Sequence, residues 1–186
     1  MGTGRSLITG QSFLDNAIVF EDVEIAIKGL KKNKSSGEDN LINEFFLNAS
    51  LPVKLFILIL FNKLLEFEFF PGVWAIGKVV PIFKKGDKND ANNYRGITII
   101  SCLAKLFTKI LNNRLNRLIE DKNILSDVQY GFRKDRSTID CLFIVKGLID
   151  IMFSKGLKLY VCFIDYEKAY DLIDRACLFH KLIKEI

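Results

Sequence analysis

The segment that runs from Lys158 to Asp165 has the sequence KLYVCFID. The residues between its two charged ends are all apolar, and they are rich in aromatic and β-branched side chains, which is typical of a strand. Because successive side chains of a strand point to opposite faces, this unbroken run predicts a central strand covered on both sides. Asp165 follows at the C-terminal end of the predicted strand, which would hold its carboxylate rigidly.

The carboxylate of Asp165 allows two interpretations. A rigidly held carboxylate is suited to binding a metal ion, and Mg²⁺ prefers oxygen ligands. The alternative is that Asp165 caps the turn that follows. Asp171 and Asp174 are candidates for a second ligand, although helix capping explains Asp171 equally well. The chain contains no Asp-Asp pair, so a complete two-metal site is not evident from the residues alone.

Helices are predicted on both sides of this strand. Ser137 is followed three residues later by Asp140, which is the spacing of a capping box, so a helix is expected to begin there and to end at Gly156. Another helix is expected over Arg175–Ile186, with His180 packed on its apolar stripe. The residues of the first helix that are expected to face the interior are Leu142, Val145, Ile149 and Met152.

The preceding part of the chain predicts more helices and a pair of strands. The expected helices are Val23–Leu30, Asn43–Ser50, Val53–Phe69 and Ser101–Ile119. Val53–Phe69 is apolar nearly all round and is expected to be buried. The runs Gly77–Phe83 and Ile97–Ile100 predict two paired strands joined by the polar loop Lys84–Gly96, and Pro81 indicates an edge strand or a bulge. Helices and strands in unequal blocks predict an α+β fold.

The composition is that of an ordinary globular protein. Of the 186 residues, 49% are hydrophobic and 26% are charged, which does not indicate a disordered chain. The longest apolar run, Leu55–Phe61, is much shorter than the roughly 20 residues that a membrane-spanning helix needs. No signal peptide is visible at Met1–Gln11. Four cysteines without CxxC spacing argue against a structural zinc site and favour buried, reduced thiols in an intracellular protein.

The positive charge is concentrated in the middle of the chain. The net charge is +5, and Lys78–Arg136 contains 13 Lys and Arg against 6 Asp and Glu. The remainder of the chain is slightly acidic. A basic region of this kind is expected of a surface that contacts phosphates, although many solvated surfaces have the same composition.

Two segments of the basic region carry candidate binding residues. In the first, the loop Lys84–Lys88 leads to Asn93–Gly96, where Lys would supply a point charge and Arg a bidentate donor for phosphate. In the second, Gln129–Thr138 interleaves aromatic residues with cations before a helix N-terminus. Aromatic rings stack on bases, and free N–H groups hold phosphates. The structural alternatives are a solvated loop tip and packing of Tyr130 and Phe132 against the core.

Five blocks of the sequence together resemble the reverse transcriptases of LINE-type (non-LTR) retrotransposons. They are Lys34–Asp39; Trp74 with Val80–Asp87; Asn93–Ile97; Gln129–Arg133 with Arg136–Thr138; and Phe163–Tyr166 with Lys168–Asp171. They occur in the order of the family. The resemblance implies an incomplete right-hand polymerase, with fingers over 21–157 and the first palm strand and following helix over 158–186. The residues before it, 1–20, are expected to form a flexible segment.

The resemblance also implies roles for individual residues. Asp165 would be the catalytic residue and would bind Mg²⁺, with an RNA template, a DNA primer and deoxynucleoside triphosphates as partners. The residues implied for the triphosphate are Lys84, Lys85, Arg95, Tyr166, Glu167 and Tyr170, of which Tyr170 would exclude a ribose 2′-hydroxyl. Those implied for nucleic acid are Gln129, Tyr130, Gly131, Phe132, Arg133, Lys134 and Arg136.

Two departures from the family pattern affect these expectations. Gly96 stands where the family usually has proline, which loosens the turn at Arg95. The chain also stops after the first palm strand, before the aromatic-Ala-Asp-Asp turn and the thumb, and one carboxylate cannot hold two Mg²⁺ ions. We therefore expect that the chain alone does not polymerise. Its apolar strand should favour association with the rest of the polymerase or with a second copy.

Three functions are compared on this basis. An incomplete RNA-directed DNA polymerase is the leading interpretation. The main alternative is a non-catalytic nucleic-acid-binding module that retains only the basic surface of the fingers. A Mg²⁺-dependent phosphohydrolase that uses Asp165 and Asp171 would lack a convincing general acid and a Gly-rich phosphate loop. Nothing indicates a membrane partner, and a nuclear location is implied by the family resemblance alone.

Overall fold

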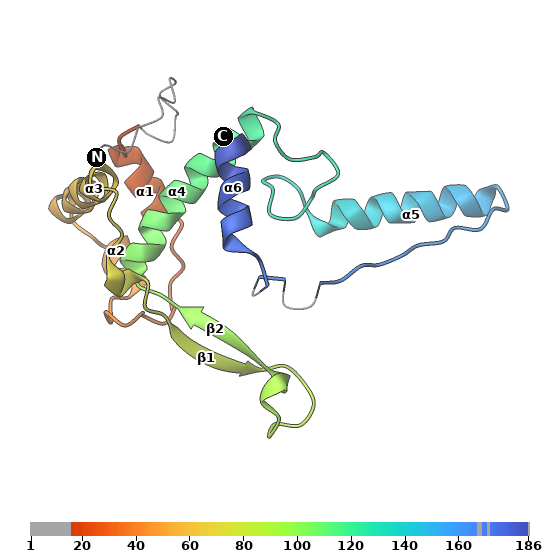
Figure 1. Cartoon of the computed structure of the whole chain (residues 1–186), viewed down its shortest axis with the longest axis horizontal. Coiled ribbons are helices and arrows are strands. Elements are labelled where there is room, and N and C mark those ends of the chain that lie inside the picture. Colours follow the sequence, from red (N-terminus) through yellow and green to blue (C-terminus); the bar gives the residue numbers. More distant parts are fainter. Residues whose placement is uncertain (1–15, 167–168, 171, 186) are drawn as a thin grey trace, which may run out of the picture. The chain divides into compact units, whose positions relative to one another are not determined.

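The computed structural model describes residues 16–166, 169–170 and 172–185, without the side chain of Glu185. These residues form six α-helices, two short 3₁₀ helices and two strands (Figure 1). The expectation of a mixed helix-and-strand fold is therefore confirmed. The chain divides into two compact units, residues 1–117 and 118–186, and each unit is described by itself.

The core of the first unit is built mainly from four helices. These are α1 (Phe20–Lys28), α2 (Asn43–Leu47), α3 (Leu51–Glu66) and α4 (Cys102–Asp121), the end of which belongs to the second unit. The ring of Phe61 is fully buried, with its centroid 5.2 Å from that of Phe107 and 6.2 Å from that of Trp74. All four helices are predicted by the sequence, with ends that differ by a few residues because helix termini depend on local capping.

The prediction that the third of these helices is buried all round is wrong. On α3, Ile57, Phe61 and Leu64 are buried, whereas Phe56 and Ile59 are 64% and 60% exposed. The helix contacts α1 on one side. Its opposite side stays open although it is apolar, since hydropathy alone does not supply a neighbouring element to cover it.

The two predicted strands form an antiparallel hairpin. β1 (Lys78–Phe83) pairs with β2 (Tyr94–Ile99). β2 begins three residues before Ile97, because the ladder continues through polar residues that the apolar pattern does not include. Pro81 lies opposite Gly96 in a two-stranded sheet, which confirms the prediction of an edge strand. Figure 1 shows the hairpin extending away from the helices of its unit.

The helix α4 begins at the cap that the sequence predicts. The Oγ atom of Ser101 accepts hydrogen bonds from the backbone N–H groups of Leu103 and Ala104, at 3.1 and 3.5 Å. The first N–H groups of a helix have no partner inside it, so the hydroxyl satisfies two of them. Phe107 and Ile110 lie on the buried face of the helix.

The predicted flexible segment 1–20 lies mostly outside the described residues. Its described part is held by contacts with two helices. The backbone N–H of Ile18 donates to the side-chain oxygen of Asn62 at 2.7 Å, and the side-chain nitrogen of Asn62 donates back to the Ile18 carbonyl at 2.9 Å. The buried guanidinium of Arg114 donates to the carbonyl groups of residues 16–17. These contacts fix the entry into α1.

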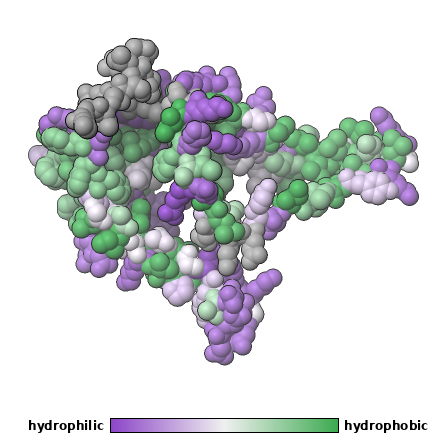
Figure 2. All heavy atoms as spheres, in the orientation of Figure 1, coloured by the Kyte–Doolittle hydropathy of each residue, from purple (hydrophilic) through white to green (hydrophobic). Residues whose placement is uncertain are grey.

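The helix α5 (Thr138–Ser154) is the longest complete helix of the second unit. Its capping box is confirmed, since the carboxylate of Asp140 accepts a hydrogen bond from the N–H of Ser137 at 2.7 Å and the Ser137 hydroxyl accepts one from the N–H of Asp140 at 3.4 Å. The prediction of an inward face is wrong, because no residue of α5 is buried. Val145 and Met152 are partly covered, whereas Leu142 and Ile149 are exposed. Figure 2 shows a mostly hydrophobic surface along this helix.

The segment Lys158–Asp165 is not a strand in the structure. It belongs to no helix or paired strand, and Tyr160, Phe163 and Ile164 expose 79 to 86% of their surfaces. A strand requires a hydrogen-bonded neighbour. The two strands in the described part of the chain pair only with each other, so this segment has no ladder to join. The prediction of a central strand covered on both sides is therefore wrong for this structure.

The helix α6 (Arg175–Glu185) confirms the predicted last helix as far as the description extends. Asp174 caps it, since Oδ1 accepts hydrogen bonds from the N–H groups of Ala176 and Cys177 at 2.9 and 3.1 Å. These bonds lower the pKa of the Asp174 carboxyl. The prediction that His180 is packed is wrong, because the imidazole is exposed.

The cysteines were expected to be reduced and buried, and the structure agrees with only part of this. All four cysteines are free, as predicted, but only Cys102 is buried. Burial raises the pKa of its thiol. Cys141 is partly buried, and Cys162 and Cys177 are exposed, because the second unit has little core to receive them. Among the described residues, no helix combines the length and the hydropathy that crossing a membrane would require.

Candidate nucleic-acid interface

The loop between β1 and β2 is held by hydrogen bonds between its own side chains and backbone. A carboxylate oxygen of Asp87 accepts from the N–H of Asn89 at 2.9 Å, and a carboxylate oxygen of Asp90 accepts from the N–H of Asn92 at 2.9 Å. These are two successive Asx turns. The side-chain nitrogen of Asn93 donates to the Asp87 carbonyl at 2.9 Å. The loop therefore has a defined conformation.

Gly86 and an aromatic pair close the base of this loop. Gly86 has a φ of 96°, and a Cβ atom there would lie 2.7 Å from the side-chain nitrogen of Asn93, so both the backbone and the space require glycine. The ring centroids of Phe83 and Tyr94 lie 5.5 Å apart. The Tyr94 hydroxyl donates to the carbonyl of Lys88 at 2.9 Å. The loop is thus anchored at both ends.

Three cations that the family resemblance assigns to the triphosphate lie on this hairpin and are exposed: Lys84, Lys85 and Arg95. Lys84 and Lys85 follow β1 directly, and Arg95 lies on β2 opposite Ile82. None of the three cations pairs with a carboxylate of the described residues. Their charge is therefore available to an anion, while their assignment to a triphosphate stays a prediction. The hydrophilic tip of the hairpin is visible in Figure 2.

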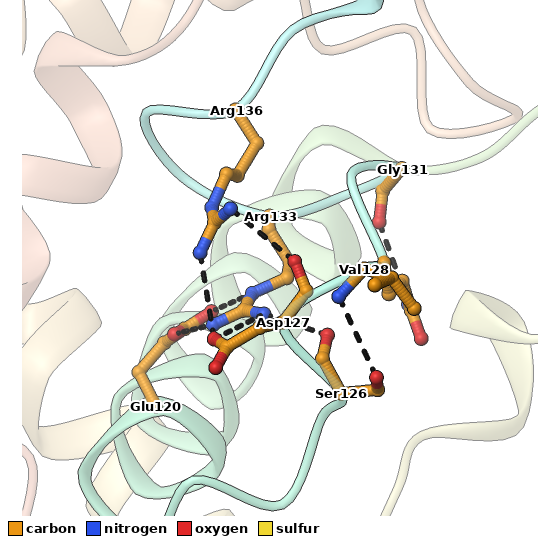
Figure 3. A network of polar contacts seen from close by, with 8 residues as sticks. Glu120, Ser126, Asp127, Val128, Gly131, Arg133 and Arg136 are labelled. Atoms are coloured by element: carbon orange, nitrogen blue, oxygen red, sulfur yellow. Dashed lines mark hydrogen bonds and ion pairs between the residues drawn. The ribbon is translucent and has the colours of Figure 1, made fainter. Parts of the chain in front are cut away.

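In the second unit, Arg133 ties the loop after α4 to the end of that helix. Its Nε and Nη2 atoms donate to the two carboxylate oxygens of Glu120 at 2.9 and 2.6 Å, and Nη1 donates to the carbonyl of Ser126 at 3.0 Å (Figure 3). The Arg133 side chain is only 7% exposed. The pairing lowers the pKa of Glu120 and raises that of Arg133. The observed contacts of Arg133 position the loop, and its contact with nucleic acid stays a prediction.

Arg136 is oriented by the same loop. Its Nη1 atom donates to the Asp127 carbonyl at 3.3 Å, and its Nη2 atom lies 3.6 Å from an Asp127 carboxylate oxygen (Figure 3). The guanidinium also lies 5.2 Å from the ring centroid of Tyr130, which is a cation–π contact. Lys134 is exposed and has no partner among the described residues. Lys134 is therefore free to meet an anion, whereas Arg136 is partly exposed and already paired with Asp127.

Phe132 presents its ring to solvent beside these cations. It has a φ of 62° and is 90% exposed, so it does not pack against the core. Its ring is perpendicular to that of the exposed Tyr170, with centroids 6.2 Å apart. Gln129 and Gly131 are exposed as well, whereas Tyr130 is partly buried. Exposed aromatic rings next to cations form the surface that base stacking uses.

Asp165 is exposed and makes no hydrogen bond or ion pair with a described residue. Tyr166 beside it is also exposed, whereas Glu167 and Asp171 lie outside the described residues. The other candidate ligand, Asp174, caps α6. In the part of the chain that the structure describes, no three His, Cys, Asp or Glu side chains come together as metal ligands. These residues do not by themselves fit a site for two Mg²⁺ ions.

The block Lys34–Asp39 has a role that sequence patterns do not reveal. The Ser101 hydroxyl donates to Oδ2 of Asp39 at 2.6 Å. A Cβ atom on Gly37 would lie 2.6 Å from the backbone nitrogen of Ser101, so the two backbones approach each other closely. The block is therefore fastened to the junction between β2 and α4. The glycine within the block is the signal that could have indicated such an approach.

Comparison with known proteins gives the family of the chain. Residues 82–185 match the family model described as reverse transcriptase (RNA-dependent DNA polymerase). A probable RNA-directed DNA polymerase from transposon BS of Drosophila melanogaster is 32% identical over 167 residues, which cover 88% of this chain and 18% of that protein. The RNA-directed DNA polymerase from mobile element jockey of Drosophila funebris is 26% identical, with 88% of this chain and 18% of that protein covered.

A third relative matches the same share of this chain. The putative 115 kDa protein in type-1 retrotransposable element R1DM of Drosophila melanogaster is 25% identical over 166 residues, or 88% of this chain and 16% of that protein. The chain thus spans less than a fifth of the length of these relatives. The family match covers more than half of the chain and includes both basic segments and Asp165. The chain belongs to the reverse transcriptase family and, with these relatives, to its LINE-type (non-LTR) retrotransposon members.

Proposed function

We propose that this chain forms the fingers and the beginning of the palm of a right-hand RNA-directed DNA polymerase. Residues 21–157 would supply the fingers, and residues 158–186 the first palm strand and the helix after it. The observation that carries the proposal is the family match, which runs from β1 to α6 and so includes both basic segments together with Asp165. A nuclear location, suggested by the family resemblance alone, is part of this proposal.

The hairpin loop is the proposed binding site for the triphosphate. Lys84, Lys85 and Arg95 are exposed and lack carboxylate partners among the described residues. The Asx turns fix the loop before a ligand arrives, which lowers the entropic cost of binding. A flexible Lys head and a forked Arg head suit the dispersed charges of a triphosphate. Tyr166, Glu167 and Tyr170, which the family resemblance also assigns to the triphosphate, would contribute contacts of their own.

The loop 126–137 is the proposed contact with the template strand. Arg136 and Lys134 would bind phosphates, and the ring of Phe132 would stack on a base. Arg133 would act as a positioning residue, because Glu120 and the backbone already engage its guanidinium. Binding that depends on phosphates should weaken steeply as salt is added, since each contact releases counterions.

Asp165 is the proposed ligand that this chain contributes to the Mg²⁺ site of the complete enzyme. When bound, Mg²⁺ would stabilise the charge that develops on the transferred phosphoryl group. Asp165 is one carboxylate, exposed and without a partner among the described residues. The remaining ligands would come from palm strands that pair with residues 158–165. The chain alone is therefore proposed to bind nucleic acid without extending a primer.

One experiment tests both parts of this proposal. The chain is mixed with an RNA template annealed to a DNA primer, and binding is followed by fluorescence anisotropy while primer extension is followed on gels with Mg²⁺ present. We expect salt-sensitive binding, no extension, and unchanged affinity in the Asp165→Asn variant. Mg²⁺-dependent DNA synthesis by the chain alone, or the absence of any binding, would overturn the proposal.

A non-catalytic nucleic-acid-binding module is the second candidate. It is favoured by one observation, namely that the cationic surfaces lie within the described residues whereas a metal-binding cluster does not. Deoxynucleoside triphosphate binding separates the two candidates. A polymerase piece should bind the triphosphate more weakly after Lys84→Gln, Lys85→Gln and Arg95→Gln are combined. A module of the second kind should show no triphosphate affinity to lose.

A further inference from the structure

A basic hollow in the first unit lies outside the segments that the sequence assigns to ligands. It has a volume of about 460 Å³ and lies among the loop after α1, the strand β2 and the start of α4. Lys31 and Lys34 line it from the loop, Ile97–Ile99 from β2, and Lys105 from α4. The hollow thus gathers three cations from two elements that are distant in the sequence.

The loop that carries two of these lysines is fixed by the start of α2. The side-chain nitrogen of Asn43 donates to the carbonyl of Lys31 at 2.7 Å, and the buried side chain of Asn43 also lines the hollow. The N–H of Asn33 donates to Oε1 of Glu44 at 2.6 Å. The backbone at Lys31 and Lys34 is therefore positioned before a ligand binds, so binding costs less conformational entropy.

The three lysines of the hollow form no ion pair with a described residue. No described carboxylate pairs with Lys31, Lys34 or Lys105. Two acidic side chains of neighbouring segments are engaged elsewhere: Glu44 accepts from the loop backbone, and Asp39 accepts from the cap of α4. Three like charges brought near one another repel, and an anion relieves that repulsion.

One further cation, Arg95, lies on β2 between the hollow and the hairpin loop. Ile99, Ile97 and Arg95 alternate along the strand and therefore lie on one face of it. At about 3.4 Å per residue, Arg95 lies roughly 14 Å along the strand from Ile99. Arg95 thus extends the basic surface beyond the hollow, which suits an extended polyanion better than a compact acid.

We infer that this hollow binds the phosphodiester backbone of a nucleic acid strand, with Lys31, Lys34 and Lys105 each placed against a phosphate. The inference rests on the proposed function, because a polymerase brings a nucleic acid strand to this unit. It adds a binding surface that is separate from the hairpin loop and from residues 126–137. An acidic segment of a protein is the competing occupant, and the experiment distinguishes it.

The experiment compares two variants of the full chain with the same change in charge. In the first, Lys31, Lys34 and Lys105 are all changed to Gln, which keeps their stems. In the matched control, Lys28, Lys63 and Lys109 are changed to Gln; they lie on the same unit and do not line the hollow. Anisotropy with a labelled single-stranded oligonucleotide is measured across a salt series, and the unfolding transition verifies that both variants fold.

We expect the hollow variant to bind about tenfold more weakly than the control. Its log affinity should fall with log salt by a slope roughly 2 units shallower than that of the wild type, since each lost contact to a single strand removes about 0.7 units. Restoring the charge with Arg at the three positions should recover the affinity. An oligonucleotide with an uncharged backbone should not distinguish the hollow variant from the control.

Other outcomes separate the failure of this inference from that of the proposed function. If the wild type binds in a salt-dependent manner and the two variants weaken equally, the hollow is not a binding site although the proposed function stands. If the wild type binds no oligonucleotide, both are wrong. If polyglutamate binds the wild type and loses affinity in the hollow variant, while the oligonucleotide does not, the occupant is an acidic protein segment and the inference is overturned.

Discussion

The hydroxyl of Ser101 donates a hydrogen bond of 2.6 Å to Oδ2 of Asp39, across 62 residues of sequence. Ser101 is also the N-cap of α4 and is itself buried. One hydroxyl therefore joins the block Lys34–Asp39 to the helix that carries much of the core. The bond therefore fixes the position of the loop that lines the basic hollow relative to the end of β2.

The Asp39→Ala variant should lower the stability of the first unit. It leaves the buried Ser101 hydroxyl without its acceptor, which costs about 1–2 kcal/mol in the free energy of unfolding. Urea unfolding followed by the fluorescence of Trp74, the single tryptophan of the chain, measures the change. Glu38→Ala is the control, because Glu38 is exposed and has no described partner. Equal midpoints for the two variants would contradict the prediction.

Substitution of Gly37 by alanine should be destabilising at the same junction. The new Cβ atom would lie 2.6 to 2.8 Å from backbone atoms of Ile100 and Ser101. A backbone moves less readily than the end of a side chain, so the expected cost is about 1–3 kcal/mol. Gly72→Ala is the matched control, since nothing lies within 4 Å of a Cβ atom there. The prediction fails if both variants unfold at the urea concentration of the wild type.

The pair Glu120–Arg133 should make the stability of the second unit depend on pH. Arg133 lowers the pKa of Glu120 below its ordinary value of 4.5, and a group of this kind stabilises the fold above its unfolded pKa. That contribution should disappear as the pH falls from about 5 through the lowered pKa of the folded state, because protonated Glu120 loses its charge. Denaturation followed by circular dichroism over this range measures the effect.

A matched pair of variants tests this pH dependence. Glu120→Gln should remove part of the loss of stability at acid pH, whereas Glu38→Gln should leave the wild-type profile unchanged. Parallel profiles for the wild type and Glu120→Gln would show that the ion pair does not stabilise the loop.

The exposed apolar surface of α5 should cause self-association. Phe143 and Phe153 are 78% and 85% exposed. Burial of such apolar surface between two molecules is favourable in water. Phe143→Lys combined with Phe153→Lys should lower light scattering and the binding of a hydrophobic dye, without a loss of helix content. In the control variant, Val19 and Ile25, which are also exposed apolar residues, are changed to Lys. Identical scattering for both variants would count against a role for α5.

Local patterns predicted the elements better than they predicted burial. The helix starts at Ser101 and Ser137 and the pairing of β1 with β2 follow from capping and turn chemistry within a few residues. The apolar runs in α3, in α5 and over 158–165 predict more burial than the structure shows. Hydropathy states that a side chain gains from burial, but whether it is buried depends on which other segments are near it.

The candidate sites show the same division. The exposure of Lys84, Lys85 and Phe132 agrees with what loops rich in cations and turn residues lead one to expect. The inward position of Arg133 was not predictable. Its partner Glu120 lies on the preceding helix, and the sequence does not show that the loop folds back onto that helix. The hollow with Lys105 was missed for the same reason, since its lysines come from elements far apart in the sequence.

The sequence by itself determined the family, the helices and the hairpin of β1 and β2, and the caps and turns at their ends. These depend on residues that are close together along the chain, so short-range sterics and hydrogen bonding decide them. Only the tertiary structure decided which apolar faces are buried, which cations are paired internally, and that Asp39 meets Ser101. Contacts of this kind depend on distances between remote segments, and those distances exist only once the chain has folded.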